Sequence, residues 1–310
     1  MISVIILNWN GWTDTIECLK SLKSAEVPVR ENGPETVRFF VVDNGSTDDS
    51  LAKFEKFRYD PSAPAFTLVE TGQNLGFAGG MNVGIRRAID DGASWILLLN
   101  NDTTVTPAFL RLLTAAGDRD PHIGMLNPKI LRAAEPTKFW FIGGRVNWMH
   151  TRGSHASFGE EDRGQHDTPA PFETDYCTGC CLLARRELIE EIGLLPEAYF
   201  IYYEDTEWGI RARRRQWRCV VVPEAKIFHK GAASSREHSF LYIRYHIRNG
   251  LLLARRTGNP LQIGAAYSTS ALRAFHQLIK RYREPKKRRW SSAILLGIKD
   301  AWLGRTGKIR

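Results

Sequence analysis

Short apolar runs alternate with helical patterns through the first third of the chain. Four runs have the length and composition of buried strands: 2–7, 38–42, 66–70 and 94–99. Between the first two, apolar side chains recur at helical spacing at Trp12, Ile16 and Leu19, and Thr106-Pro107 predicts the start of a later helix. Strands that alternate with helices predict an α/β fold with a mixed, mostly parallel sheet flanked by helices.

The rest of the chain predicts a mixed region followed by helices. Residues 143–175 are rich in Gly, His and charged residues without periodicity, and we expect a long loop that orders over a substrate. A strand, a helix and a second strand are predicted next, at 180–184, 185–193 and 218–223. Helical patterns then cover 238–257, 265–282 and about 294–303. We therefore predict two parts, a catalytic domain at 1–235 and a helical C-terminal extension at 236–310.

Charge sets the extension apart from the domain. The chain has a net charge of +9, but residues 236–310 alone carry 17 Lys/Arg against 3 Asp/Glu. This excess favours a polyanionic partner such as anionic lipid headgroups or nucleic acid, and a solvated basic surface is the alternative. No apolar stretch approaches the ~20 residues of a membrane-spanning helix. The five cysteines favour a reduced, cytoplasmic protein. We expect peripheral association with the inner face of a membrane, and no nucleic acid, because no nucleic-acid-binding signature is present.

Polar clusters follow three of the predicted strands. They are Asn8-Trp9-Asn10, Asp43-Asn44-Gly45-Ser46 and Asn100-Asn101-Asp102. In open α/β sheets ligands bind beyond the carboxyl ends of the strands, so the three clusters predict one shared site. The alternative is that Asn, Asp and Gly only make turns there.

Two residues are candidates for a metal site. Asp102 follows a fully apolar strand, and Mg2+ or Mn2+ prefers carboxylate and phosphate oxygens. His229 follows another short strand, and imidazole is a good ligand for Mn2+. A structural role is the alternative for a lone histidine.

The acidic run at 204–207 offers a candidate general base. Either Asp205 or Glu204 is suited to removing a proton from an attacking hydroxyl. Carboxylates in the first turn of a helix also complement its dipole, so a structural role stays open. The aromatic residues just before the run favour a site, because an apolar wall raises the basicity of a carboxylate and sugars stack on rings.

Two further motifs limit the kinds of nucleotide-binding and metal sites that the sequence can form. The Gly-rich turn at 72–82 joins a strand to a helix, where backbone amides can approach a diphosphate. It is not the dinucleotide fingerprint, and no P-loop is present. The cysteines of CTGCC lack the second pair that a structural zinc site needs, and we interpret them as buried strand residues.

Six segments in this order resemble family-2 glycosyltransferases of the GT-A fold, and most of all their bacterial rhamnosyltransferase-like branch. They are SVIILNWNG, VVDNGSTDDS, NLGFAGGMNVGI, ILLLNNDTTV, YCTGCCLLARRELIEEIGLLPEAYFIYYEDTEWGIRARRRQW and IFHKGAASS. The resemblance covers about residues 1–255. It implies that the protein transfers a sugar, with inversion, from a nucleotide-diphosphate donor to a saccharide acceptor in cell-surface polysaccharide synthesis. The sugar that the resemblance favours is rhamnose, from dTDP-rhamnose. It also implies a lipid-linked acceptor and a Mg2+ or Mn2+ cofactor.

The resemblance implies donor-binding roles for the first polar clusters and the Gly-rich turn. The residues that match the base and ribose pocket are Asn8, Asn10, Asp43 and Ser46. Those that match the segment beside the ribose and diphosphate are Asn74, Gly76 and Asn82.

The later motifs match the catalytic positions of the family. Asn100-Asn101-Asp102 occupies the place of the Asp-x-Asp motif, so Asp102 is implied as the metal ligand and both asparagines as donor-binding. Asp205 matches the catalytic base, with Glu204 beside it, and His229 matches a histidine that completes the metal site in some relatives. We add Arg248 as a residue that helps neutralise the diphosphate.

One difference from the family motif leaves alternative functions open. Asn100 replaces the first carboxylate of the motif, which predicts weaker metal affinity, although an amide still forms hydrogen bonds there. A UDP-hexose or galactofuranose donor is an alternative to dTDP-rhamnose, and a catalytically weak sugar-nucleotide-binding homologue is an alternative class. A nucleotidyltransferase would need a basic, Gly-rich loop after the first strand, where this chain has NWNGWTD.

Overall fold

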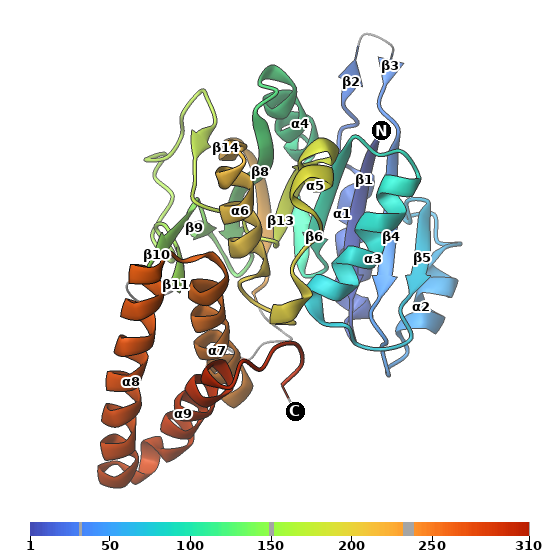
Figure 1. Ribbon diagram of the computed structural model, residues 1–310. Coiled ribbons are helices and arrows are strands. Elements are labelled where there is room, and N and C mark those ends of the chain that lie inside the picture. Colours follow the sequence, from blue (N-terminus) through green and yellow to red (C-terminus); the bar gives the residue numbers. More distant parts are fainter. Residues whose placement is uncertain (31–32, 149–151, 232–238, 310) are drawn as a thin grey trace.

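A mixed β-sheet with helices on both faces forms the centre of the protein (Figure 1). The computed structural model describes residues 1–30, 33–148, 152–231 and 239–309. Within these residues the strand order is β12-β14-β8-β13-β6-β1-β4-β5, with β7 paired to β14 and β9 to β8. The predicted α/β class and mixed sheet are confirmed.

The first half of the sheet is parallel. Its strands are β1 (Ile2–Asn8), β4 (Val37–Asp43), β5 (Phe66–Glu70) and β6 (Trp95–Asn100). All four were predicted to within one residue at each end, and β4 and β6 flank β1 in parallel register. A short hairpin, β2 (Val29–Arg30) and β3 (Gly33–Pro34), stands apart from this sheet. Because parallel strands end at one edge, the three polar clusters lie at the same end of the sheet.

Side chains of β1 alternate between two hydrophobic cores. Ile2, Val4 and Ile6 pack with α1 (Trp12–Lys23), α2 (Ser50–Phe57) and α4 (Phe109–Arg119) on one face. Ile5 packs with α3 (Gly76–Asp90), α5 (Arg186–Ile192) and α6 (Glu204–Arg214) on the other. Burial on both faces explains the unbroken apolar sequences of these strands.

The second half of the sheet is mixed in direction. β13 (Cys181–Arg185) lies antiparallel between β6 and β8 (Ile123–Arg132), and β14 (Arg218–His229) runs parallel to β8. Three short or outer strands pair antiparallel: β7 (Thr103–Val105), β9 (Glu135–Phe141) and β12 (Phe172–Glu173). A 3-10 turn, η1 (Glu197–Tyr199), precedes α6.

Two predictions about local structure need correction. The stretch 143–175 is not a long loop, because β10 (Gly144–Asn147) and β11 (Arg152–His155) form a hairpin inside it and β12 joins the main sheet. The helix expected at Pro107 begins two residues later, at Phe109, after a turn in which the Phe109 N–H donates to the Thr106 carbonyl (3.2 Å).

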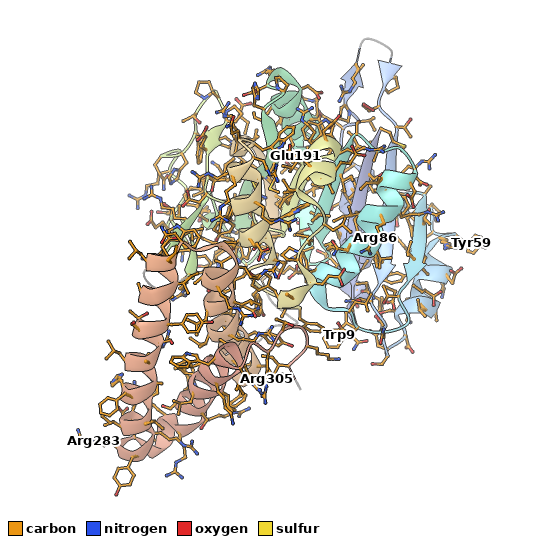
Figure 2. The ribbon with its side chains drawn as sticks, viewed as in Figure 1. Trp9, Tyr59, Arg86, Glu191, Arg283 and Arg305 are labelled. Carbon is orange, nitrogen blue, oxygen red and sulfur yellow. The ribbon has the colours of Figure 1, made fainter. Side chains whose placement is uncertain are left out.

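Three helices form the C-terminal extension: α7 (Phe240–Thr257), α8 (Pro260–Arg283) and α9 (Arg288–Trp302), with the turn η2 (Pro285–Lys287) between the last two. α7 returns to the domain through Leu252 and Leu253, which pack with Tyr199 and Tyr203. The α8–α9 end projects away from the sheet, with Arg283 near its tip (Figure 2). The predicted boundary between residues 235 and 236 lies outside the described residues. No described helix is long and apolar enough to span a membrane.

Candidate active site

The first polar cluster is a hydrogen-bonded network at the carboxyl end of β1. Asn8 is fully buried at the end of β1, and its Nδ2 donates to Asp43 Oδ2 (2.8 Å) and to Ser46 Oγ (3.1 Å). The Asn10 N–H donates to the same Ser46 hydroxyl (3.0 Å), and Thr15 Oγ1 donates to Asn8 Oδ1 (2.8 Å). Four of the predicted donor-binding residues therefore lie together.

The Gly-rich turn is attached to the second cluster and to the aromatic segment before α6. Asn44 Nδ2 donates to the Gly76 carbonyl (3.0 Å), and the Gly76 N–H donates to Asn74 Oδ1 (2.9 Å). Gly76 has a φ of +78°, and a Cβ there would lie 2.3 Å from the Phe200 carbonyl oxygen. Only glycine fits this position without displacing the backbone at Phe200.

Strand pairing brings the two predicted metal ligands together. β7 follows Asp102 directly and pairs with the end of β14, where His229 is opposite Thr103. His229 Nε2 lies 3.1 Å from Asp102 Oδ1, and the Lys230 N–H donates to the Asp102 carbonyl (2.9 Å). The chain therefore fixes both ligands through its backbone.

The imidazole of His229 is suited to a cation. It is buried, yet neither ring nitrogen has a hydrogen-bond partner in the part of the chain that the structure describes, since the short approach to Asp102 does not meet the geometry of a hydrogen bond. Buried polar atoms without partners are rare, and a carboxylate beside an imidazole is a ligand pair that a divalent cation accepts. No group of three His, Cys, Asp or Glu ligands exists among the described residues, so further ligands would have to be phosphate oxygens or water.

The candidate base is held at the start of α6. Asp205 Oδ2 accepts from the Gly179 N–H (3.0 Å), and Oδ1 accepts from the Thr206 N–H (2.6 Å) and hydroxyl (3.1 Å). The next residue of the same loop, Cys180, accepts through its carbonyl from the Asn100 N–H (2.8 Å). Residues 179–180 thus connect the base directly to the end of β6 that carries the metal-ligand motif.

Glu204 differs sharply from its neighbour. It is buried, and its Oε2 has no hydrogen-bond partner among the described residues. Burial, and next the negative charge of Asp205, raise the pKa of Glu204 to about 8. Tyr202 and Tyr203, just before it, both have positive φ values (68° and 77°), as does Phe200 (69°). Such strained backbone before a carboxylate pair is typical of functional sites.

The side chains of two predicted donor-binding residues, Asn82 and Arg248, form their hydrogen bonds outside these clusters. Asn82 is buried in α3, where its amide binds the backbone of Leu195 and donates to Glu197 Oε1 (2.8 Å). Arg248 is buried in α7 and donates to the carbonyls of Tyr199 and Gly307 (both 2.7 Å). Both side chains join segments of the protein, and their donor-binding roles stay predictions. Asn101, by contrast, lies beside the first polar cluster and donates to Thr15 Oγ1 (3.0 Å), which in turn donates to Asn8.

The structure adds His155 to the site, a residue that the sequence did not indicate. Its ring packs edge-on against Trp140 (4.7 Å between centroids), and Trp140 packs in the same way against His229 (4.3 Å). Burial lowers the pKa of His155, while Asp205 lies close enough to oppose this shift electrostatically. No motif indicated this residue, because the sequence of the hairpin that carries it predicted a loop.

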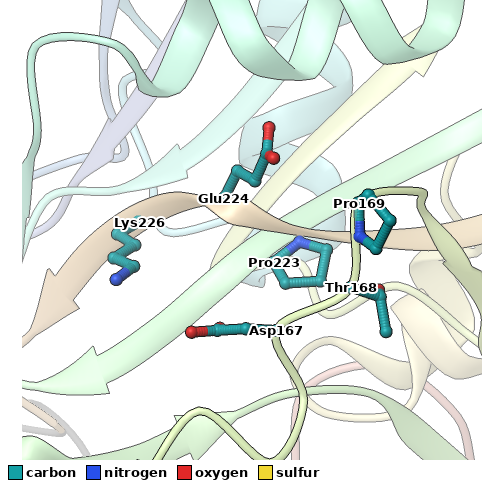
Figure 3. Close-up of a pocket in the computed structure, with 6 residues that line it drawn as sticks. All are labelled: Asp167, Thr168, Pro169, Pro223, Glu224 and Lys226. Atoms are coloured by element: carbon teal, nitrogen blue, oxygen red, sulfur yellow. The ribbon is translucent and has the colours of Figure 1, made fainter.

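The five cysteines are buried and free, and burial raises the pKa of four of them, as expected for packing residues. A separate pocket lies between residues 167–169 and the irregular part of β14 at 223–226 (Figure 3). None of the predicted site residues lines it. One of its walls, Asp167, is already bound by the buried ammonium of Lys129 (2.5 Å), so we do not interpret it as the active site.

Comparison with known proteins decides the family. The model of glycosyl transferase family 2 matches residues 3–193, well over half of the chain. The chain belongs to glycosyl transferase family 2. This glycosyltransferase is 28% identical over 240 residues to N-acetylglucosaminyl-diphospho-decaprenol L-rhamnosyltransferase of Mycobacterium tuberculosis, covering 71% of this chain and 75% of the relative. It is 23% identical over 266 residues to dTDP-rhamnosyl transferase RfbF of Shigella flexneri, covering 82% and 83%.

Among solved structures, the glycosyltransferase is similar in fold to a mannosyltransferase of Pyrobaculum calidifontis in complex with GDP-Man and Mn2+. The TM-score is 0.59 at 16% identity, and the match covers 98% of this chain and 87% of that one. The GT-A fold predicted from the resemblance is confirmed.

Proposed function

We propose that this glycosyltransferase transfers rhamnose from dTDP-rhamnose to a lipid-linked saccharide acceptor, with inversion at the anomeric carbon and with a divalent metal. The observation that carries this proposal is the direct connection between base and metal motif. Gly179 donates to Asp205, and Cys180 accepts from Asn100 at the end of β6. The names of both relatives support rhamnose as the sugar, and the mycobacterial name supports a diphospho-lipid acceptor.

The chemistry assigned to the chain is a single displacement. Asp205 accepts the proton of an acceptor hydroxyl, whose oxygen attacks the anomeric carbon from the face opposite to the nucleotide. Three hydrogen bonds fix the carboxylate, which keeps the acceptor oxygen and the base in one geometry. Asp102 and His229 are the residues that would hold Mg2+ or Mn2+, which offsets charge on the departing nucleotide diphosphate.

Glu204 supports the base by staying neutral. With its pKa raised to about 8, Glu204 retains its proton at neutral pH, so no second negative charge adjoins Asp205. Asp205 is then the one negatively charged member of the pair that meets the acceptor.

A membrane surface is the proposed location of the acceptor. The outer face of α8 exposes Leu272 (71%), Phe275 (65%) and Tyr282 (87%), which recur at helical spacing. Four exposed basic residues follow at the α8–α9 turn: Lys286, Lys287, Arg288 and Arg289. Lys287 also forms an ion pair with Glu284, in the same turn. An apolar stripe beside cationic residues matches an anionic bilayer, whose interface takes up the apolar side chains.

The donor is tested by thermal shift with dTDP, UDP and GDP, each with and without Mn2+. We expect dTDP with Mn2+ to raise Tm most, because a ligand that binds only the folded state stabilises it. Transfer from dTDP-rhamnose to a diphospho-lipid-linked sugar, with the product anomer assigned by NMR, then tests reaction and inversion. Stabilisation by UDP alone would overturn the donor assignment in favour of a UDP-hexose or galactofuranose, and retention at the anomeric carbon would overturn the displacement.

A further inference from the structure

Two neighbouring residues of α7 hold the backbone that leads into α6. Asn249 is fully buried, and its Nδ2 donates to the carbonyls of Ile201 (2.7 Å) and Tyr202 (3.0 Å). Arg248 is also buried, and its Nη2 donates to the carbonyl of Tyr199 (2.7 Å). Arg248 Nε also donates to Asn249 Oδ1 (2.8 Å), so each side chain orients the other. The pair therefore binds three carbonyls of one short segment as a unit.

The segment that this pair binds has an unfavourable backbone conformation. Phe200, Tyr202 and Tyr203 have φ values of 69°, 68° and 77°, although all three carry a Cβ. Left-handed backbone is costly for such residues and persists only where the surrounding structure enforces it. The hydrogen bonds from α7 supply this enforcement. Asp205 lies two residues after Tyr203, so its position depends on how the segment turns into α6.

α7 also binds the first turn of α6 directly. Glu207 is buried there, and Arg256 of α7 donates to both of its carboxylate oxygens (2.7 and 2.9 Å). The Tyr199 hydroxyl donates to Glu207 Oε2 (2.7 Å). α7 thus holds the chain on both sides of Asp205, through Asn249 before it and through Arg256 after it.

The segment after α9 encloses Arg248. It turns back toward the domain (Figure 1), and the Gly307 N–H donates to the carbonyl of Ala198 (2.6 Å). The Gly307 carbonyl in turn accepts from Arg248 Nη1 (2.7 Å). Each of the three guanidinium nitrogens of Arg248 therefore donates to an acceptor within the protein. This arrangement suits a positioning role better than contact with a diphosphate.

The segment before α6 also contacts the Gly-rich turn. The Phe77 N–H donates to the carbonyl of Phe200 (2.7 Å). The turn has separate hydrogen bonds of its own, from Asn44 Nδ2 to the Gly76 carbonyl and from the Gly76 N–H to Asn74 Oδ1. A displacement of the segment should therefore affect the base more than it affects donor binding.

We propose that Arg248 and Asn249 are positioning residues for the base Asp205, and that they act by fixing the left-handed backbone from which α6 begins. The proposal rests on the proposed function for the role of Asp205. Misplacement of a reacting group by about 1 Å can lower a rate by about 100-fold, so a small shift of α6 is sufficient. Because α7 is the first helix of the C-terminal extension, the extension then supports the active site directly.

Steady-state transfer from dTDP-rhamnose to a diphospho-lipid-linked saccharide tests the pair. Arg248→Met and Asn249→Leu remove the hydrogen-bond donors and keep most of the side-chain volume, and we expect each to lower kcat by about tenfold or more. We expect the Kd of dTDP with Mn2+ to change by less than about threefold, because the donor turn keeps its own hydrogen bonds. Arg248→Lys keeps an ammonium donor within reach of one carbonyl and should give an intermediate kcat.

Arg185→Met is the matched control. Arg185 likewise joins separate segments by donating to carbonyls, those of Ile123 (3.1 Å) and Gly117 (2.7 Å), but it lies at the amino end of β6, away from the polar clusters. We expect this variant to lose thermal stability and to keep kcat within about twofold. An equal fall of kcat in the control, or an unchanged kcat in both Arg248→Met and Asn249→Leu, would refute the positioning role.

Amide hydrogen exchange keeps the test independent of sugar transfer. Peptides that cover residues 200–208 should lose protection in Arg248→Met and Asn249→Leu, whereas those of β1 should keep it. If Asn249→Leu does not fold, Arg248→Met and Arg248→Lys carry both measurements.

Three outcomes separate this proposal from its alternatives. Unchanged protection at residues 200–208, or lost protection with a normal kcat, would overturn it. A fall in dTDP affinity of more than about tenfold in Arg248→Met would assign Arg248 to the donor diphosphate instead. Failure of the unaltered protein to transfer rhamnose contradicts the proposed function, whereas the exchange measurement still decides whether the pair holds the segment before α6.

Discussion

His229 Nε2 lies 3.1 Å from Oδ1 of Asp102, although the two residues are far apart in the sequence. The pairing of β7 with the end of β14 holds them there, and the ring nitrogens of His229 have no other partner among the described residues. A buried imidazole without a hydrogen-bond partner among the described residues, held beside a carboxylate, has the chemistry of a ligand pair for a divalent cation.

Replacement of either ligand should remove the metal dependence of nucleotide binding. We expect Asp102→Ala and His229→Ala each to weaken the Mn2+-dependent part of nucleotide affinity by more than about tenfold, because even residues that only support metal ligands contribute this much. Calorimetry with and without Mn2+ measures the difference. Asp90→Asn, at an exposed carboxylate on α3, is the control. Unchanged metal-dependent affinity in both ligand variants would refute the metal site.

Loss of the base should affect turnover and leave the donor bound. We expect Asp205→Asn to lower kcat by about 100-fold or more, the usual contribution of a positioned general base, with little change in nucleotide affinity. Asparagine keeps the acceptor oxygen that Gly179 or Thr206 contacts, so the loop should stay in place. Turnover near that of the unaltered protein would contradict the assignment of Asp205 as base.

Glu204 predicts an unusual dependence of stability on pH. Its pKa in the folded protein is about 8, above the ordinary value of 4.5, so the folded state holds its proton more tightly than the unfolded state. The associated stability is fully present below about pH 4.5 and is lost as the pH rises through about 8. Glu204→Gln resembles the protonated acid and should remove this loss, so its Tm should fall less than that of the unaltered protein between these pH values. Parallel Tm–pH curves for the two proteins would show that Glu204 is not held neutral.

The parallel half of the sheet was predictable because its signals are local. β1, β4, β5 and β6 are buried on both faces, so each is an uninterrupted apolar run, and polar turn residues mark the end of three of them. The predicted metal motif stands next to such an end, at β6, whereas the predicted base begins α6 after an aromatic segment; the family resemblance assigned the roles of both.

The other half was harder to predict for physical reasons. β8 is almost fully buried, yet Asn127-Pro128-Lys129 interrupts its apolar pattern. The structure satisfies each polar group through distant residues: Asn127 binds the backbone of Thr178, and the buried Lys129 pairs with Asp162 (2.8 Å) and Asp167. Both partners of Lys129 lie in the stretch 143–175 that the sequence predicted as a loop, and Thr178 lies just after it, so neither β8 nor the hairpin with His155 had a local signal.

Gly76 offers a test of the packing between the donor turn and the aromatic segment. Gly76→Ala should lower the free energy of unfolding by more than Gly72→Ala, because both have positive φ (78° and 71°) but only Gly76 faces a backbone atom at 2.3 Å. The shared conformational penalty is about 1–2 kcal/mol, and the clash with Phe200 adds to it in Gly76→Ala. Urea unfolding measures both variants. Equal losses would mean that Phe200 moves away without cost.

The extension should bind membranes through charge and apolar contact together. We expect the protein to float with vesicles that contain anionic lipid, to float less at high salt, and not to float with neutral vesicles, because screening weakens surface electrostatics. Replacement of the basic turn residues Lys286, Lys287, Arg288 and Arg289 by Gln should abolish flotation, since each contributes about 1 kcal/mol near an anionic surface. Phe275→Ser, on the exposed face of α8, should weaken flotation that remains at high salt. As a control, Arg58→Gln with Arg163→Gln removes two positive charges that are paired with Glu55 and Glu161, and this variant should float normally. An equal loss of flotation in the control would mean that net charge alone controls membrane binding.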